Sequence, residues 1–173
     1  MKRFAAFLRG VSPMNCRMPE LARAFDAAGF SEVSTVLSSG NVVFGATGTP
    51  RAIARKAQAA MQEHLGRSFL TFVRPVAALE AMLQADPYQA FRLPAGAKRI
   101  VTFLEEPPAQ APVLPMRADG ASLLLLQDLH LFSAYVPGAK AAAFMVLIER
   151  TFGKDVTTRT WDTVRKVCAA GTR

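Results

Sequence analysis

The sequence predicts an α+β protein in which a ferredoxin-like β-α-β-β-α-β N-terminal half is packed with a second, mixed α/β half. Two observations lead to this prediction. Strand-like and helix-like apolar patterns follow one another in that order over the first 74 residues. A connection with two prolines and a glycine, residues 87–96, then separates a half at 1–86 from a half at 97–173. The two halves can also form one compact domain.

Four strands and two helices make up the first 74 residues. The strands are short apolar runs at residues 3–8, 33–37, 41–44 and 69–74. The helices lie at residues 19–28 and 50–65. Thr49 suits the cap of the second helix, and Pro19 and Pro50 suit first helical positions. Gly29 and Gly66 suit the positions just past the helix ends.

The rest of the chain predicts three more helices and three more strands. The helices are expected at residues 76–83, 138–152 and 161–169. The strands are expected at residues 99–104, 122–126 and 129–135. Thr160 suits the cap of the last helix. Residues 105–115 carry four prolines and are expected to be irregular, because each proline removes a backbone N–H donor.

Composition and charge leave two interpretations open. The chain is 51% hydrophobic and 20% charged, which is typical of a globular protein rather than a disordered one. The net charge is +8, and a basic excess favours anionic partners such as phosphates or nucleic acid. The basic residues are spread along the chain without a dense block, which favours simple solubility instead.

Neither a metal site nor a membrane span is expected. Cys16 and Cys168 form no C-x-x-C pair and are far in sequence from both histidines, which argues against zinc. A disulfide between them stays open, and two free thiols are the simpler account. The longest uncharged apolar run, residues 141–148, is much shorter than the about 20 residues of a membrane helix. Because the sequence shows no export signal, we expect a cytoplasmic protein. We also expect no cofactor.

The first polar motif, residues 8–19, connects the first strand to the first helix. Arg9, Asn15 and Arg17 lie there, next to the unpaired N–H groups of a helix start, and such an arrangement holds anions. In the alternative interpretation this is an ordinary connection, in which Asn15 only fixes the backbone of the loop.

The second motif, residues 38–44, is predicted to form a tight hairpin around Ser39 and Gly40. Ser39 and Asn41 can present hydrogen-bonding groups at its tip, so both are candidate ligand-binding residues. Serine, glycine and asparagine are also what a tight turn requires. The two interpretations are compatible, because a turn can carry a site.

The third motif, residues 159–166, begins the last helix. Thr163 suits a helix start, and Arg159 lies just outside it, where it can join the backbone amides in binding phosphate. Trp161 belongs either to this site or to the core. Lys140, near the start of the preceding helix, is a further candidate anion contact, although its surroundings lack the pattern of a P-loop.

Three blocks of residues carry a resemblance to a known family. They are Leu8-Arg9-Gly10-Val11, Ser39-Gly40-Asn41-Val42-Val43-Phe44 and Arg159-Thr160-Trp161-Asp162-Thr163-Val164-Arg165-Lys166. At this spacing they cover essentially the whole chain, which resembles the family known as domain of unknown function 1697. The resemblance implies an α+β fold with ferredoxin-like elements in a bacteria-type cytoplasmic protein. It implies no assigned activity.

The chain departs from that family's pattern in two places. The family usually has a glycine pair in the first loop, where this chain has Ser12-Pro13-Met14. Proline removes an amide donor and stiffens the loop, which weakens its case as an anion site. The family often has asparagine just before and after its tryptophan, where this chain has Thr160 and Asp162. The negative charge of Asp162 argues mildly against an anion site there.

Three functions follow as hypotheses. The leading one is a binding protein for an anionic ligand, either nucleotide-like or nucleic acid, because cationic residues flank the predicted loop and helix starts. The second is an enzyme acting on a phosphorylated or acyl small molecule, although no nucleophile–base pair is visible. The third is an interaction protein such as a homodimer, since a sheet with one open face often pairs through it. A site requires Arg9, the 39–41 turn and the 159–163 helix start to line one cleft.

Overall fold

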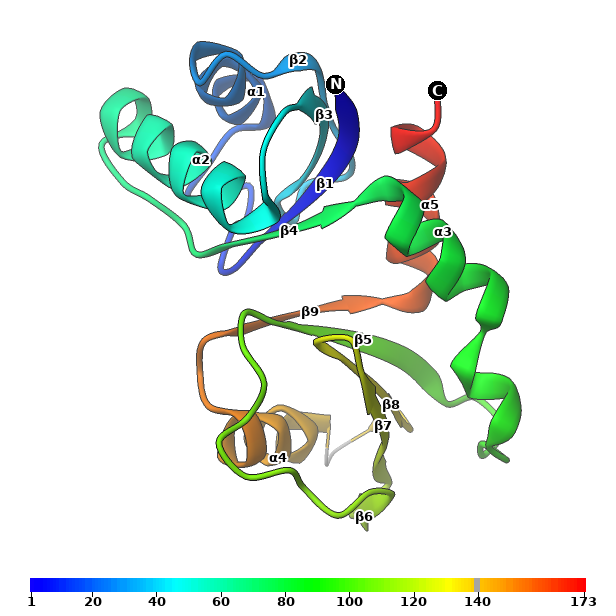
Figure 1. Cartoon of the computed structure of the whole chain (residues 1–173). Coiled ribbons are helices and arrows are strands. Elements are labelled where there is room, and N and C mark those ends of the chain that lie inside the picture. Colours follow the sequence, from blue (N-terminus) through cyan, green and yellow to red (C-terminus); the bar gives the residue numbers. More distant parts are fainter. Residues whose placement is uncertain (139–140) are drawn as a thin grey trace. The chain divides into compact units, whose positions relative to one another are not determined.

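The computed structural model of the chain describes residues 1–138 and 141–173, which form two compact units. Unit 1 comprises Met1–Gln84 and Val164–Arg173, and unit 2 comprises Ala85–Thr163. The described residues contain two antiparallel sheets and five α-helices, which confirms the α+β class (Figure 1). No helix in these described ranges is long and apolar enough to cross a membrane.

The sheet of unit 1 has the strand order β2-β3-β1-β4, and all neighbouring strands are antiparallel. The strands are β1 (Lys2–Leu8), β2 (Ser31–Thr35), β3 (Asn41–Ala46) and β4 (Thr71–Pro75). All four lie at or next to the expected strands. β2 ends earlier than its apolar pattern predicts, because Leu37 has a φ of +59° and therefore belongs to the turn.

Two helices, α1 (Met18–Ala27) and α2 (Pro50–Leu65), lie on one face of this sheet (Figure 1). The predicted ends of α2 are confirmed. Thr49 Oγ1 accepts a hydrogen bond from the Ala52 N–H at 3.2 Å, which satisfies one of the unpaired donors of the first turn. Gly66 ends the helix with a φ of +72°, a conformation that glycine adopts without strain.

Phenylalanine side chains fill the core between these helices and the sheet. The Phe44 ring lies 4.6 Å from the Phe30 ring, 5.4 Å from the Phe25 ring and 6.3 Å from the Phe4 ring, measured between centroids. Burying an aromatic side chain of this size contributes about 1.5–3 kcal/mol. The cluster therefore supplies a large part of the free energy that holds unit 1 together.

The opposite face of the same sheet is also covered. Phe7 and Val43 point to that side and are fully buried. α3 (Val76–Ala85) and the end of α5 (Trp161–Gly171) lie there, and Gly171 packs directly against the side chains of Val76 and Val43. This contact places the last ten residues in unit 1, whereas the sequence grouped them with the half at 97–173. It also covers the open face on which the homodimer hypothesis depended.

The sheet of unit 2 has the order β6-β7-β8-β5-β9, again with antiparallel neighbours. Its strands are β5 (Lys98–Leu104), β6 (Met116–Ala118), β7 (Ala121–Gln127), β8 (His130–Tyr135) and β9 (Val156–Thr160). The sequence did not predict β6 or β9. Both are edge strands with few apolar residues, so the hydrophobic pattern does not mark them. The repeated threonines of β9 were the available signal, because β-branched residues favour strands.

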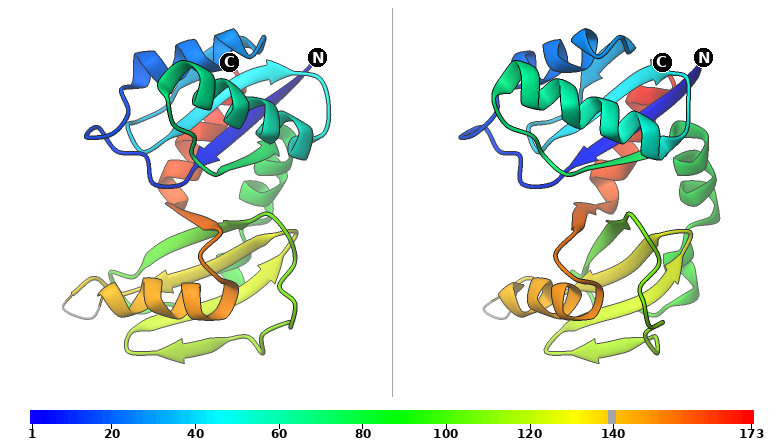
Figure 2. Two further views of the ribbon diagram at one scale, coloured as in Figure 1. Left: turned by 90° about the vertical axis from the view of Figure 1, so that its left-hand side faces the viewer. Right: turned by 60° about the vertical axis from the view of Figure 1, so that its left-hand side comes forward.

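One helix, α4 (Ala141–Phe152), covers one face of this second sheet (Figure 2). Phe144 and Ile148 are buried in the interface, which confirms the predicted apolar stripe. Thr102 of β5 lies on the same face as Ile100, which packs in this core. The Thr102 hydroxyl is fully buried and has no hydrogen-bond partner among the described residues. A polar group in such a position destabilises the fold.

Replacing Thr102 with valine is expected to raise the free energy of unfolding by about 1 kcal/mol. Valine has nearly the same shape and removes a buried hydroxyl that has lost its hydrogen bond to water. Urea unfolding followed by circular dichroism measures the change. Thr158→Val is the matched control, because Thr158 lies opposite Thr102 on β9 but is only half-buried. An unfolding midpoint for Thr102→Val at or below that of the unmodified chain would contradict the prediction.

Candidate functional site

The first two polar motifs meet at one corner of unit 1. The Leu8 N–H donates to the Gly40 carbonyl at 2.8 Å, which ties the loop after β1 to the turn before β3. Gly40 is so close to Val11 that a Cβ atom on it would lie 2.8 Å from the Val11 Cβ. Arg9 and Ser39, two of the candidate ligand-binding residues, therefore lie on neighbouring loops.

The amides of Asn15 and Asn41 are engaged within this corner. Asn15 Nδ2 donates to the Gly10 carbonyl at 2.8 Å, and its Oδ1 accepts from the Ser12 N–H at 2.9 Å. Asn41 is fully buried, and its Nδ2 donates to the Val36 carbonyl at 2.9 Å. These bonds fix a loop and a turn, as the structural interpretation of each motif expects. Ligand binding by either residue stays a prediction.

Three further candidate residues, Arg159, Trp161 and Thr163, lie in unit 2. The Thr163 N–H donates to Thr160 Oγ1 at 3.1 Å, so Thr160 caps α5 as predicted. Trp161 is 4% exposed. Arg159 is also buried, and its Nη1 donates to Thr157 Oγ1 at 2.8 Å. Burial lowers the pKa of Arg159 to about 10, so the guanidinium stays protonated at neutral pH.

The candidate residues are thus divided between the two units. Arg9, Asn15, Ser39 and Asn41 belong to unit 1, and Arg159, Trp161 and Thr163 belong to unit 2. Lys140 lies outside the described residues. A single cleft lined by both ends of the chain stays a prediction, and each unit has to be considered for a site of its own.

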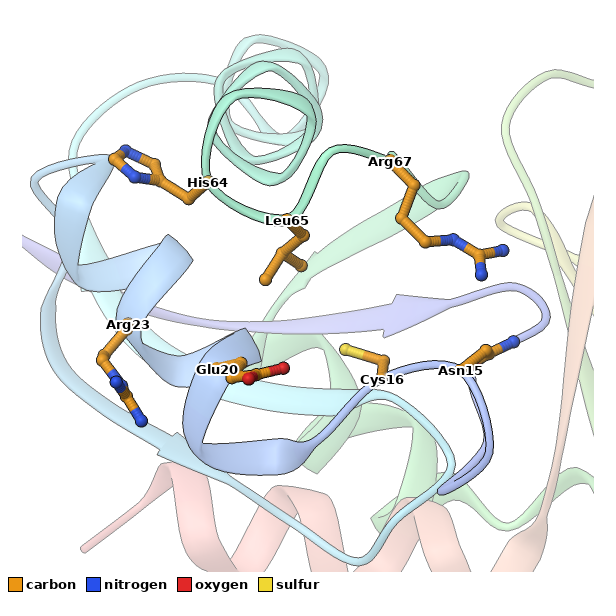
Figure 3. Close-up of a pocket in the computed structure, with 7 residues that line it drawn as sticks. All are labelled: Asn15, Cys16, Glu20, Arg23, His64, Leu65 and Arg67. Carbon is orange, nitrogen blue, oxygen red and sulfur yellow. The ribbon is translucent and has the colours of Figure 1, made fainter.

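Unit 1 contains a cavity of about 440 Å³ beside the start of α1 and the end of α2 (Figure 3). We call it the α1–α2 pocket. It is lined by Asn15, Cys16, Glu20, Arg23, His64, Leu65 and Arg67. Among the sequence candidates, Asn15 contributes to this lining. The other six residues are ones that the sequence did not select.

Charges of both signs surround a thiol in this pocket. Glu20 lies on one side of Cys16 and Arg67 on the other, and Leu65 points toward the space between them (Figure 3). Burial raises the pKa of the Cys16 thiol, Glu20 raises it further, and Arg67 lowers it. The sulfur therefore senses both charges, and the thiol stays protonated at neutral pH.

The cysteines do not form the disulfide that the sequence left open. Cys16 and Cys168 are both buried free thiols. In the ranges that the structure describes, no group of three or more histidine, cysteine, aspartate and glutamate side chains could hold a metal ion.

A second cavity, of about 260 Å³, lies in unit 2 where β5 and α5 begin. We call it the Arg99 groove. It is lined by Lys98, Arg99, Thr160, Trp161 and Asp162. The pairing of β5 with β9 creates it, because Ile100 lies opposite Thr160 in the register. The start of β5 is thereby brought beside the start of α5.

Aromatic rings hold Arg99 in this groove. Its guanidinium carbon lies 5.6 Å from the centre of the Tyr88 ring and 5.8 Å from the centre of the Trp161 ring. The two rings contact each other edge to face at 5.2 Å, and the Tyr88 hydroxyl donates to the Ile100 carbonyl at 2.7 Å. Each cation–π contact contributes about 0.5–2 kcal/mol. No carboxylate of the described residues lies within ion-pair distance of Arg99.

The sequence predicted Trp161 for a site but missed Lys98, Arg99 and Tyr88. An adjacent pair of cations just before a strand was the available signal for the first two. Tyr88 lies in a 3₁₀ helix, Pro87–Ala90, inside the segment that the sequence treats as a connection. Lys98 and Arg99 acquire their roles through the pairing of β5 with β9, which joins residues far apart in the chain, and Tyr88 joins them through its hydrogen bond to Ile100.

Comparison with known proteins agrees with the fold. Residues 1–122 match the family described as Protein of unknown function (DUF1697). No curated protein matches the chain. The conserved bacterial protein SP0830 from Streptococcus pneumoniae has a similar structure, with a TM-score of 0.77 and 18% sequence identity over 100% of this chain and 99% of that chain. The similarity to SP0830 concerns the fold alone. Because the family match extends over well more than half of the chain, the protein belongs to the DUF1697 family.

Proposed function

We propose that the protein binds a small anionic, nucleotide-like ligand in the Arg99 groove. One observation carries the proposal: a half-buried guanidinium lies over two aromatic rings at the wall of a cavity and has no carboxylate partner among the described residues. Arginine presents a planar fork of N–H donors that matches the oxygens of a phosphate or carboxylate. An arginine that is already held in place loses little conformational freedom on binding.

The other groove residues favour a phosphate-bearing ligand with hydroxyl groups. Lys98 adds a second cation beside Arg99, and the two together favour a phosphate over a neutral group. Asp162 lines the same groove, and a carboxylate there accepts hydrogen bonds from hydroxyl groups such as those of a ribose. Trp161 contributes an apolar edge. Asp162, which the sequence counted against an anion site, thus selects for a ligand with both an anion and donors.

The strand order of unit 1 supports a further structural proposal. The antiparallel order β2-β3-β1-β4, with α1 and α2 on one face, is the order expected of the ferredoxin-like arrangement that the sequence predicts. We also retain a cytoplasmic location as a proposal. Fractionation of cells that produce the tagged chain tests it, and recovery in the membrane or secreted fraction would contradict it.

Replacing Arg99 with glutamine is expected to weaken nucleotide binding roughly 10- to 100-fold, because a charge-assisted hydrogen bond contributes about 1.5–3 kcal/mol. Isothermal titration with ATP, AMP and inorganic phosphate measures the affinities. Arg92→Gln is the matched control, because Arg92 is an exposed arginine of the same unit that does not line the groove. Equal losses of nucleotide affinity in the Arg99 and Arg92 variants would contradict the proposal, as would no nucleotide binding by the unmodified chain.

The salt dependence of binding distinguishes a small ligand from nucleic acid. A single-stranded oligonucleotide that neutralises several cations loses affinity steeply as salt concentration rises. Titration of a labelled oligonucleotide at low and moderate salt therefore gives the comparison. Oligonucleotide binding tighter than ATP binding, with a steep salt dependence, would assign the groove to nucleic acid. ATP binding with weak salt dependence supports the proposed small ligand.

A further inference from the structure

The α1–α2 pocket of unit 1 has a different charge pattern from the Arg99 groove. Glu20, from the first turn of α1, lies on one side of Cys16, and Arg67, just after α2, lies on the other (Figure 3). The Cys16 thiol and the Leu65 side chain face the space between them from opposite walls, Cys16 from the loop before α1 and Leu65 from the end of α2 (Figure 3). The pocket thus offers an anionic group, an apolar middle and a cationic group in sequence.

The two charged groups are available to a ligand. Among the described residues, no ion pair joins the Glu20 carboxylate to Arg67, Arg23 or His64. The Arg67 guanidinium is instead placed over the Phe69 ring, 4.6 Å from its centre. This contact restricts the side chain. No hydrogen bond from the Arg67 guanidinium to another described residue engages its N–H donors.

The remaining basic residues of the pocket do not change this pattern. Arg23 and His64 are turned away from Cys16 (Figure 3), and Arg23 Nε donates to the Pro19 carbonyl at 3.3 Å. A purely anionic ligand placed over Cys16 would approach the Glu20 carboxylate and be repelled by it. A purely cationic ligand would meet the same penalty at Arg67. A ligand that carries both charges avoids both penalties.

We propose that the α1–α2 pocket binds a small zwitterion, an amino acid or a dipeptide, with its ammonium group on Glu20 and its carboxylate on Arg67. Its apolar side chain packs on Leu65 and Cys16. The volume of about 440 Å³ lies within the range of about 300–1,000 Å³ usual for small-molecule sites. The proposal is independent of the Arg99 groove, because it concerns other residues and another class of ligand.

Blocked ligands test the two charges one at a time. The probes are L-leucine and glycyl-leucine, together with N-acetyl-L-leucine, which lacks the cation, and L-leucinamide, which lacks the carboxylate. At least one zwitterion is expected to bind roughly 10-fold more tightly than either blocked form. Each blocked form lacks one charged group and therefore loses one charge-assisted hydrogen bond to the pocket. Equal binding of N-acetyl-leucine and the zwitterions would overturn the proposal, as would no binding of either zwitterion at millimolar concentration.

Variants assign each charge to its residue. Glu20→Gln is expected to weaken leucinamide and zwitterion binding and to strengthen N-acetyl-leucine binding, because it removes the carboxylate that repels this anion. Arg67→Gln is expected to do the reverse: it weakens binding of the three ligands that carry a carboxylate, L-leucine, glycyl-leucine and N-acetyl-leucine, and strengthens binding of leucinamide. Arg55→Gln is the control, because Arg55 is an exposed arginine of α2 that does not line the pocket, and it should change nothing. Loss of all four ligands in the Arg55 variant, or the same pattern in both test variants, would overturn the assignment.

Cys16 reports whether the ligand occupies this pocket. A bound zwitterion should slow the alkylation of Cys16 by iodoacetamide, while Cys168 reacts at an unchanged rate. Peptide mass spectrometry measures the alkylation of each cysteine over time. Cys168 is the internal control because it is a buried free thiol that does not line the pocket. Zwitterion binding without protection of Cys16 would place the ligand elsewhere and overturn the proposal. The outcome does not depend on nucleotide binding.

Discussion

Replacing Trp161 with alanine is expected to lower the free energy of unfolding by about 3–5 kcal/mol, the usual range for truncating a buried tryptophan. The indole is 4% exposed. Its ring contacts Tyr88 at 5.2 Å and Phe132 at 6.3 Å, both edge to face, and carries the Arg99 guanidinium on its face. The alanine variant leaves a large void among these groups and removes one of the two rings that position Arg99.

Urea unfolding followed by circular dichroism is the appropriate measurement for this variant. Trp161 is the single tryptophan of the chain, so its replacement removes the intrinsic tryptophan fluorescence that would otherwise report unfolding. Trp161→Phe is the matched control, because phenylalanine keeps an aromatic face toward Arg99 and leaves a smaller void. A loss below about 1 kcal/mol in the alanine variant would show that the cluster is not a packed core, contrary to the contacts above.

The same pair of variants connects stability to the proposed function. Below the unfolding transition, Trp161→Phe should retain most of the ATP affinity, because Tyr88 and a phenyl ring still hold Arg99. Trp161→Ala should lose affinity even at temperatures where it stays folded, because Arg99 keeps one ring in place of two. Equal affinities in the two variants would separate the aromatic cluster from ligand binding.

Local sequence chemistry predicted the helices well, because their ends are fixed by neighbouring residues. Thr49 and Gly66 close α2 by hydrogen bonding and backbone conformation within a few positions along the chain. Thr160 caps α5 in the same way. The edge strand β9 escaped prediction because what makes it a strand is its pairing with β5. That pairing joins residues more than fifty positions apart and leaves a weak apolar pattern.

The candidate sites were predicted less well for the same reason. Trp161 was selected from a local motif, but Arg99 joins it through the register of β5 and β9. The α1–α2 pocket combines the first loop with the end of α2, and of its lining the sequence selected Asn15. Residues become a site through contacts between distant segments, whereas turn and cap residues show themselves locally. Asn41 illustrates the converse, since its conspicuous motif serves a turn.

Replacing Gly40 with alanine is expected to lower the free energy of unfolding by about 2–5 kcal/mol, for two separable reasons. Gly40 has a φ of +85°, a conformation that costs a residue with a Cβ roughly 1–2 kcal/mol. The new Cβ would also lie 2.8 Å from Val11 Cβ and 3.1 Å from Leu8 Cβ. Neither atom is the end of a flexible side chain, so the loop after β1 must shift, at a further cost of about 1–3 kcal/mol.

Gly10→Ala separates the two reasons, because Gly10 has nearly the same φ, +80°, and open space where its Cβ would lie. The control should therefore lose only the conformational part, about 1–2 kcal/mol. The difference between the two variants in urea unfolding measures the close approach of the loop and the turn. If Gly40→Ala and Gly10→Ala are equally destabilised, the two loops are not in contact. A clearly larger loss of stability in Gly40→Ala than in Gly10→Ala means that packing requires the glycine of the Ser39-Gly40-Asn41 motif, whatever the neighbouring side chains bind.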